Sequence, residues 1–141
     1  EKIYSPIIDL CAADMIVAFE KMEALRWLPY LKKGGKVVVN NYEIPPMPVI
    51  TGKAEYSTEI LERIKQSADT IIIDAAQKAK ELGNSRVMNV IILGTIIKLM
   101  ELEDIDWDDI IRKNVKQNFV DINILALQKG KKLVSNNNDI L

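Results

Sequence analysis

Three short apolar runs constrain the fold of this chain more than any other feature. They are DMIVAF (14–19), KVVVNN (36–41) and DTIIIDA (69–75). Their apolar residues are consecutive and do not alternate with polar ones, which is typical of strands buried on both faces of a helix-covered parallel sheet. Helical patterns separate the runs, and this order predicts parallel strands joined by right-handed crossovers. We therefore expect an α/β fold, a three-layer α/β/α Rossmann-like sheet followed by a helical C-terminal part.

Turn and cap residues indicate where the helices begin and end. Proline is tolerated in the first turn of a helix, so we expect the helix over 22–28 to give way to a short one that begins at Pro29 and ends at Gly34. Ser57 or Thr58 is a preferred N-cap for the next helix. Further helices are expected over 75–82, over 85–102, from a cap at Asp106, and over 119–128 with Gly130 ending the last.

The segment 85–102 is apolar almost all round, which predicts a largely buried helix. Asn89 lies about one turn into it, so we expect its amide to be buried and hydrogen-bonded. Gly94 costs a helix interior about 1 kcal/mol relative to alanine, and close packing against another element is the simplest reason for it. Residues 1–134 are expected to form one domain, followed by a disordered tail over 135–141.

Composition excludes several classes of function. A net charge of −1 gives no field that attracts nucleic acid or a membrane surface. The longest apolar stretch, VMNVIILGTII, is shorter than the ~20 residues of a membrane-spanning helix. The chain has no histidine and one cysteine, Cys11, so it cannot hold an iron–sulfur cluster, and we expect no metal site. A lone cysteine without a signal-peptide pattern indicates the cytoplasm.

Polar residues follow the first two predicted strands. In open α/β sheets ligands bind at the carboxyl ends of the strands, where Glu20, Asn40 and Asn41 are expected. Glu20 is either a contact to a ligand or partner, or an acid placed at the start of the next helix, where the helix dipole favours it. The proline-rich stretch NNYEIPPMP is either a rigid connector or a rim that faces a partner.

A second group of polar residues opens the long apolar helix. Asn84 or Ser85 is a candidate cap. Alternatively, backbone N–H groups at this helix start, with Arg86 near, hold an anion such as a coenzyme A phosphate or a partner carboxylate, and Asn89 belongs to the same site. No GxGxxG or GxxxxGK[ST] phosphate loop occurs anywhere in the chain. We expect no catalytic residue.

Several motifs occur in a fixed order along the chain. They are SPII (5–8), ADMIVAFEKMEALRWLPYLKKGGKVVVNN (13–41), IPPMPVITGKAEY (44–56), ELGNSRVMNVIILG (81–94) and NILALQKG (123–130). This ordered set resembles the gamma domain of the 2-oxoacid:ferredoxin oxidoreductases, in particular that of indolepyruvate ferredoxin oxidoreductase beta subunits. The gamma domain of that family begins with a strand and a GxGGQG turn, which this sequence lacks. We therefore expect an N-terminally incomplete sheet, and a homo-oligomer formed through its bare edge or uncovered face.

The resemblance implies a reaction that this chain supports only in complex. An arylpyruvate such as indolepyruvate is oxidatively decarboxylated to an aryl-acetyl-CoA while ferredoxin is reduced. Thiamine diphosphate, Mg²⁺ and the iron–sulfur clusters are expected on a large partner subunit, with coenzyme A possible at the interface, so the isolated chain should be inactive. Two other functions stay open, namely a stand-alone nucleotide- or CoA-binding module and a purely structural interaction subunit.

Overall fold

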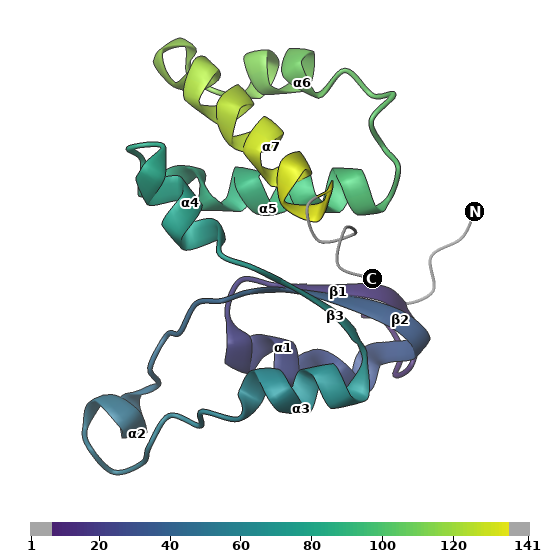
Figure 1. Ribbon diagram of the computed structural model, residues 1–141, viewed down its shortest axis with the longest axis vertical. Coiled ribbons are helices and arrows are strands. Elements are labelled where there is room, and N and C mark those ends of the chain that lie inside the picture. Colours follow the sequence, from purple (N-terminus) through teal and green to yellow (C-terminus); the bar gives the residue numbers. More distant parts are fainter. Residues whose placement is uncertain (1–6, 136–141) are drawn as a thin grey trace. The chain divides into compact units, whose positions relative to one another are not determined.

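The computed structural model describes residues 7–135. The chain divides into two compact units between Ile72 and Ile73 (Figure 1). Residues 1–6 and 136–141 lie outside the described residues, and with them most of the predicted tail. One domain over residues 1–134 stays a prediction.

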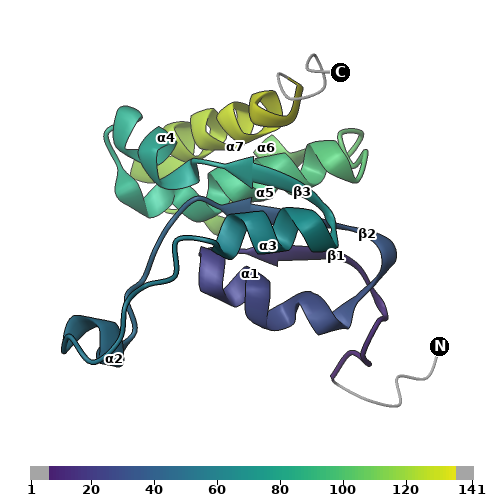
Figure 2. The same ribbon diagram turned by 60° about the horizontal axis from the view of Figure 1, so that its bottom comes forward.

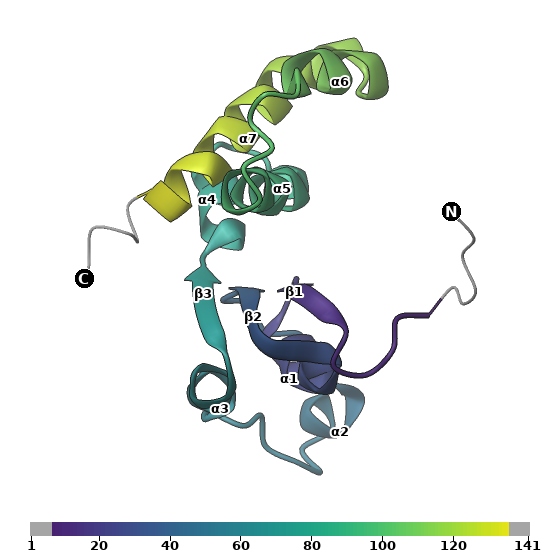
Figure 3. The same ribbon diagram turned by 90° about the vertical axis from the view of Figure 1, so that its right-hand side faces the viewer.

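The first unit contains the predicted sheet. Strands β1 (Ala13–Ala18), β2 (Leu31–Asn40) and β3 (Asp69–Ile73) lie in the order β1-β2-β3 (Figure 3). β1 and β2 are parallel, with Ile16 opposite Val37 and Ala18 opposite Val39. Helices α1 (Lys21–Trp27) and α3 (Ile60–Ser67) cover one face of the sheet. The core between them is formed by Ala13, Ile16, Ala18, Ala24, Val37, Val39, Ile60 and Ile64.

Two local predictions for the first unit are wrong. A 3₁₀ helix, η1 (Leu28–Tyr30), stands where we expected a short α-helix, and β2 begins directly after it. Five residues give too little helix to offset the cost of nucleation, whereas β1 offers Leu31 a strand partner in Ala13. Gly34, at φ +79°, lies within β2 where its register against β1 shifts, so it accommodates a strand irregularity and ends no helix.

The cap predicted for α3 is also absent. Glu59, and neither Ser57 nor Thr58, occupies the N-cap position, and its side chain makes no capping hydrogen bond. Between β2 and α3 the chain forms a long proline-rich loop that carries the short helix α2 (Met47–Ile50). In Figure 2 this loop stands away from α1, α3 and the sheet.

The second unit is helical, as predicted. It contains α4 (Ala75–Glu81), η2 (Ser85–Val87), α5 (Met88–Leu99), α6 (Trp107–Asn114), η3 (Gln117–Phe119) and α7 (Val120–Ser135). Asp106 caps α6 as expected, since its carboxylate accepts a hydrogen bond from the Asp109 backbone N–H at 3.0 Å. One buried apolar cluster in it is formed by Ile97, Ile111, Val120 and Leu127. None of the helices described over residues 7–135 has the length and apolarity needed to cross a bilayer.

Helices α5 and α7 pack closely against each other through two glycines. A Cβ atom placed on Gly94 would lie 2.2 Å from the Leu127 carbonyl oxygen, which confirms that close packing explains this glycine. The prediction that Gly130 ends the last helix is wrong, because α7 continues to Ser135. A Cβ atom on Gly130 would lie 2.0 Å from the Ile91 carbonyl oxygen, so this glycine serves the helix contact and not a helix end.

Candidate functional site

Glu20 lies at the carboxyl end of β1, in the gap before α1. It is 6% exposed and forms the N-cap of α1. Its Oε1 atom accepts a hydrogen bond from the Glu23 backbone N–H at 2.6 Å, and its Oε2 atom accepts one from the Tyr56 hydroxyl at 3.2 Å. Because both oxygens already have partners within the chain, the structure favours the capping interpretation over a contact to a ligand or partner.

Asn40 ends β2 beside Glu20 and is fully buried. Its Nδ2 atom donates a hydrogen bond to the Phe19 carbonyl oxygen at 3.1 Å, so it ties the end of β2 to the end of β1. Asn41, in contrast, is exposed. The structure therefore brings Glu20 and Asn40 together at adjacent strand ends, as predicted, in a polar cluster with hydrogen bonds to Glu23, Phe19 and Tyr56 of the first unit.

Tyr56 completes this cluster, and no local pattern in the sequence points to it. It lies 36 residues from Glu20 and reaches the carboxylate only because the proline-rich loop returns to the start of α1. Burial, together with the charge and hydrogen bond of Glu20, raises the pKa of Tyr56 to about 12. The hydroxyl therefore stays protonated near neutral pH and donates a hydrogen bond to Glu20.

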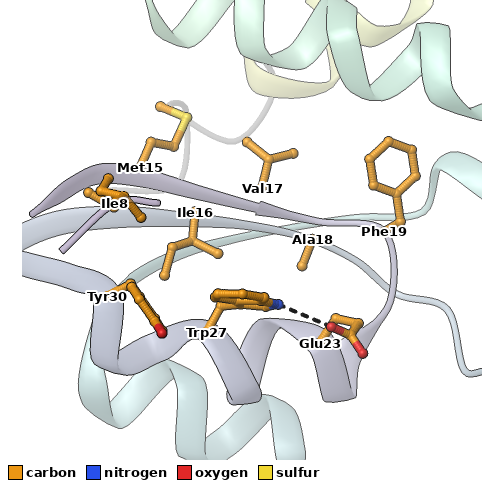
Figure 4. A pocket seen from close by; sticks show the side chains of 10 residues that line it. Ile8, Met15, Ile16, Val17, Ala18, Phe19, Glu23, Trp27 and Tyr30 are labelled. Atoms are coloured by element: carbon orange, nitrogen blue, oxygen red, sulfur yellow. Dashed lines mark hydrogen bonds between the residues drawn. The ribbon is translucent and has the colours of Figure 1, made fainter. Parts of the chain in front are cut away.

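An apolar groove of about 500 Å³ lies along β1, the outer strand of the described sheet. Met15 and Val17 point to one side of the strand, and Ile16 and Ala18 to the other (Figure 4). Trp27 lies below Ile16 and Ala18 and donates a hydrogen bond from Nε1 to Glu23 Oε2 at 3.1 Å. The groove can accommodate apolar side chains or an aromatic ring, and Glu23 and Tyr30 are the polar residues of its lining.

Glu23 and Arg26, three residues apart on α1, form an ion pair. Its side chains are 40% and 62% exposed, so it contributes little to stability. The Trp27 and Tyr30 rings lie beside it, with centroids 4.9 Å apart. This face of α1 is thus an exposed polar edge of the groove.

The second group of predicted site residues lies in the other unit. Asn84 Oδ1 accepts a hydrogen bond from the Arg86 backbone N–H at 3.0 Å, so the capping interpretation holds for Asn84. That N–H group is no longer available to an anion. Arg86 is exposed. The buried amide predicted at Asn89 is wrong, because Asn89 is exposed on the uncovered side of α5.

The residues of the described chain do not fit the cofactors that the resemblance implies for its partner. Within residues 7–135 no three or more His, Cys, Asp or Glu side chains are grouped so as to hold a metal ion. Cys11 is exposed and is the chain's single cysteine. An iron–sulfur cluster, which needs about four thiolates, therefore has no ligand set among these residues.

Comparison with known proteins decides the family. The model of the family "Pyruvate ferredoxin/flavodoxin oxidoreductase" matches residues 1–133. The chain belongs to this family. It is 34% identical over 140 residues to "Indolepyruvate oxidoreductase subunit IorB" of Thermococcus kodakarensis, and the aligned region covers 94% of this chain and 68% of that protein. The subunit of the same name from Pyrococcus horikoshii is 35% identical over 138 residues, with the same coverage.

Two solved structures share the fold. The gamma subunit of a keto/oxoacid ferredoxin oxidoreductase from Geobacter sulfurreducens has a TM-score of 0.62 at 20% identity, over 86% of this chain and 63% of its own. A 2-oxoglutarate:ferredoxin oxidoreductase from Magnetococcus marinus, solved with 2-oxoglutarate, coenzyme A and succinyl-CoA, has a TM-score of 0.68 at 20% identity, over 96% of this chain and 21% of its own. The chain thus has the Rossmann-like gamma-domain fold expected from its motifs. It spans about two thirds of the length of the two indolepyruvate oxidoreductase subunits and a smaller share of the two solved chains.

Proposed function

We propose that this chain is the non-thiamine subunit, or part of it, of an indolepyruvate-type 2-oxoacid:ferredoxin oxidoreductase. The similarity to two archaeal indolepyruvate oxidoreductase subunits along 94% of the chain carries the proposal. The complete enzyme would oxidatively decarboxylate an aryl 2-oxoacid to an aryl-acetyl-CoA and reduce ferredoxin. The chain would act in the cytoplasm.

The chain's role in this reaction is to support a larger partner. Thiamine diphosphate, Mg²⁺ and the iron–sulfur clusters would be held by that partner, as the resemblance to the family implies, and the single cysteine of this chain agrees with that for the clusters. Coenzyme A would bind at the interface between the two proteins. Of the residues considered for that interface, Glu20, Asn40 and Asn84 already serve hydrogen bonds within the chain, whereas Asn41, Arg86 and Asn89 are exposed.

Reconstitution tests the proposal. The full-length gene product that contains this chain and the large subunit encoded in the same genome are purified separately and mixed with thiamine diphosphate, Mg²⁺ and coenzyme A. Ferredoxin reduction is then followed with indolepyruvate, phenylpyruvate, pyruvate and 2-oxoglutarate in parallel. We expect reduction only with both proteins present, and with the two aryl substrates in preference to the others.

Each contrary result has a definite meaning. Turnover by the gene product of this chain alone would refute its role as a supporting subunit. A preference for pyruvate or 2-oxoglutarate would refute the aryl substrate but keep the subunit role. A stable pair of proteins without turnover of any 2-oxoacid would favour the purely structural alternative.

We also propose that the chain self-associates when its partner is absent. The apolar groove along the outer strand β1 supports this, because strand edges and exposed apolar surfaces pair with other chains. Sedimentation velocity at micromolar concentration should show a dimer or a larger species. A monomer of about 16.0 kDa would refute self-association.

A further inference from the structure

The proline-rich loop between β2 and α3, residues 43–55, carries apolar side chains that are largely exposed. Ile44, Met47 and Ile50 are 59%, 67% and 65% exposed. Helix α2, at the tip of this loop, has no buried residue. The loop stands away from the rest of the first unit in Figure 2, so its apolar side chains do not contribute to the core.

Both ends of the loop are fastened at the same place, the start of α1. On the entering side, the Lys21 backbone N–H donates to the Tyr42 carbonyl oxygen at 3.1 Å, and the Lys21 ammonium pairs with Glu43 at 2.7 Å. On the returning side, Tyr56 donates to Glu20 at 3.2 Å. The loop therefore has a closed base, as compact surface loops have.

The tip of the loop is held by its own hydrogen bonds. The backbone N–H groups of Val49, Thr51 and Lys53 donate to the carbonyl oxygens of Pro46, Met47 and Pro48 at 2.9, 2.9 and 2.8 Å. Prolines at 45, 46 and 48 restrict the backbone further. A loop with a closed base and a stiff tip loses little conformational entropy when it binds, which is the advantage of a preorganised contact surface.

We propose that this loop is a docking element whose Ile44, Met47 and Ile50 side chains enter an apolar pocket on the large partner subunit. The inference rests on the proposed function, which supplies that partner. Residues 45–52 carry no charge, so the tip matches an uncharged protein surface and not an anionic ligand or a nucleic acid. Exposed apolar side chains gathered on one element mark such contact surfaces.

A second copy of the chain is a less suitable occupant. The apolar groove along β1 is the surface of the first unit that would receive the loop of another copy. A loop-to-groove contact joins two different surfaces, so it closes as a dimer only when each copy places its loop in the groove of the other at the same time, and otherwise it propagates into rings or filaments. Self-association through the loop is therefore an outcome that the experiment has to detect.

The test replaces the apolar tip and measures binding to the purified large subunit. The variant Ile44→Gln/Met47→Gln/Ile50→Gln keeps the fold, because all three side chains are exposed. The matched control is Leu125→Gln on α7, which is 52% exposed. Circular dichroism and thermal unfolding check that both variants fold as the wild type does. Isothermal titration calorimetry gives the dissociation constants, and sedimentation velocity gives the self-association of each protein alone.

We expect the triple variant to bind the large subunit about 100-fold more weakly, and the control to bind as the wild type does. Equal binding by the triple variant would overturn the docking role while leaving the proposed function intact. Loss of self-association in the triple variant, with unchanged binding to the large subunit, would assign the loop to a second copy and also overturn the inference. A wild-type chain that does not bind the large subunit at all would instead refute the proposed function.

Discussion

Replacing Gly94 by alanine should destabilise the second unit, although alanine is the better helix former. A Cβ atom at this position would lie 2.2 Å from the Leu127 carbonyl oxygen and 3.1 Å from the Gly130 Cα atom. Both are backbone atoms, so no side-chain rotation can relieve the overlap. A carbon–oxygen contact is comfortable at about 3.4 Å, so α5 and α7 must move apart by roughly 1.2 Å.

The cost of this movement follows from what the two helices share. Thr95 is fully buried, and its hydroxyl lies 3.3 Å from both the Ile91 and the Gly130 carbonyl oxygens. Separation takes the contact to Gly130 beyond hydrogen-bonding distance. Overpacking costs about 3 kcal/mol at the upper end of its usual range, and the better helix propensity of alanine offsets about 1 kcal/mol of that. The free energy of unfolding should therefore fall by about 2 kcal/mol.

Because the chain has two tryptophans, one in each unit, the free energy of unfolding of the second unit can be measured by itself. In a Trp27→Phe background the remaining Trp107, which packs against the core of the second unit, reports its unfolding in urea by fluorescence. Asn89→Ala, on the exposed side of the same helix, is the control and should leave stability unchanged or slightly higher. Gly94→Ala/Gly130→Ala should cost less than the sum of the single variants, since one separation relieves both overlaps. A Gly94→Ala chain as stable as the wild type would refute the close contact.

Three further predictions concern single side chains. Asn40→Leu should lower the free energy of unfolding by about 1–3 kcal/mol, because it leaves the Phe19 carbonyl oxygen without its hydrogen bond. Asn41 is exposed, so Asn41→Leu should leave the free energy of unfolding unchanged, and urea unfolding of the two variants compares them. Asp106→Ala should cost about 1 kcal/mol by removing a helix cap. Because the pKa of Tyr56 is raised to about 12 from ~10 in an unfolded chain, the stabilisation that it provides is complete below pH ~10 and is lost as pH rises through about 12. Tyr56→Phe should remove this component from unfolding curves measured across that range.

The chain's strands and most of its helices could be predicted because their signals are local. Runs such as KVVVNN are apolar at consecutive positions, and Asp106 stands one residue before its helix, so a short window contains the information. The predictions failed where a distant segment competes with a local preference. Residues 31–34 lie between Pro29 and Gly35, a pattern that favours a short helix. They join β2 instead, because β1 offers backbone partners from another part of the chain.

The candidate site shows the same division. The sequence correctly placed Glu20 and Asn40 at neighbouring strand ends, because parallel strands end at one edge of a sheet. It could not show that Tyr56 donates a hydrogen bond to the Glu20 carboxylate, since that contact spans 36 residues and depends on the path of a loop. Nor could it show that Asn89 is exposed, because an apolar helix does not reveal which of its sides another element covers.

The sequence by itself thus determined the order of strands and helices and the family. It also contains no histidine, so the chain lacks the commonest metal ligand. The tertiary structure alone decided the meaning of its glycines and polar residues. Gly130 looked like a helix end and is a helix contact, and Glu20, for which the sequence left a ligand contact and a helix start both open, caps α1 and accepts a hydrogen bond from a tyrosine. The physical reason is that the same residue type can serve in several structural roles. Which role a residue has depends on the atoms that contact it from elsewhere in the chain.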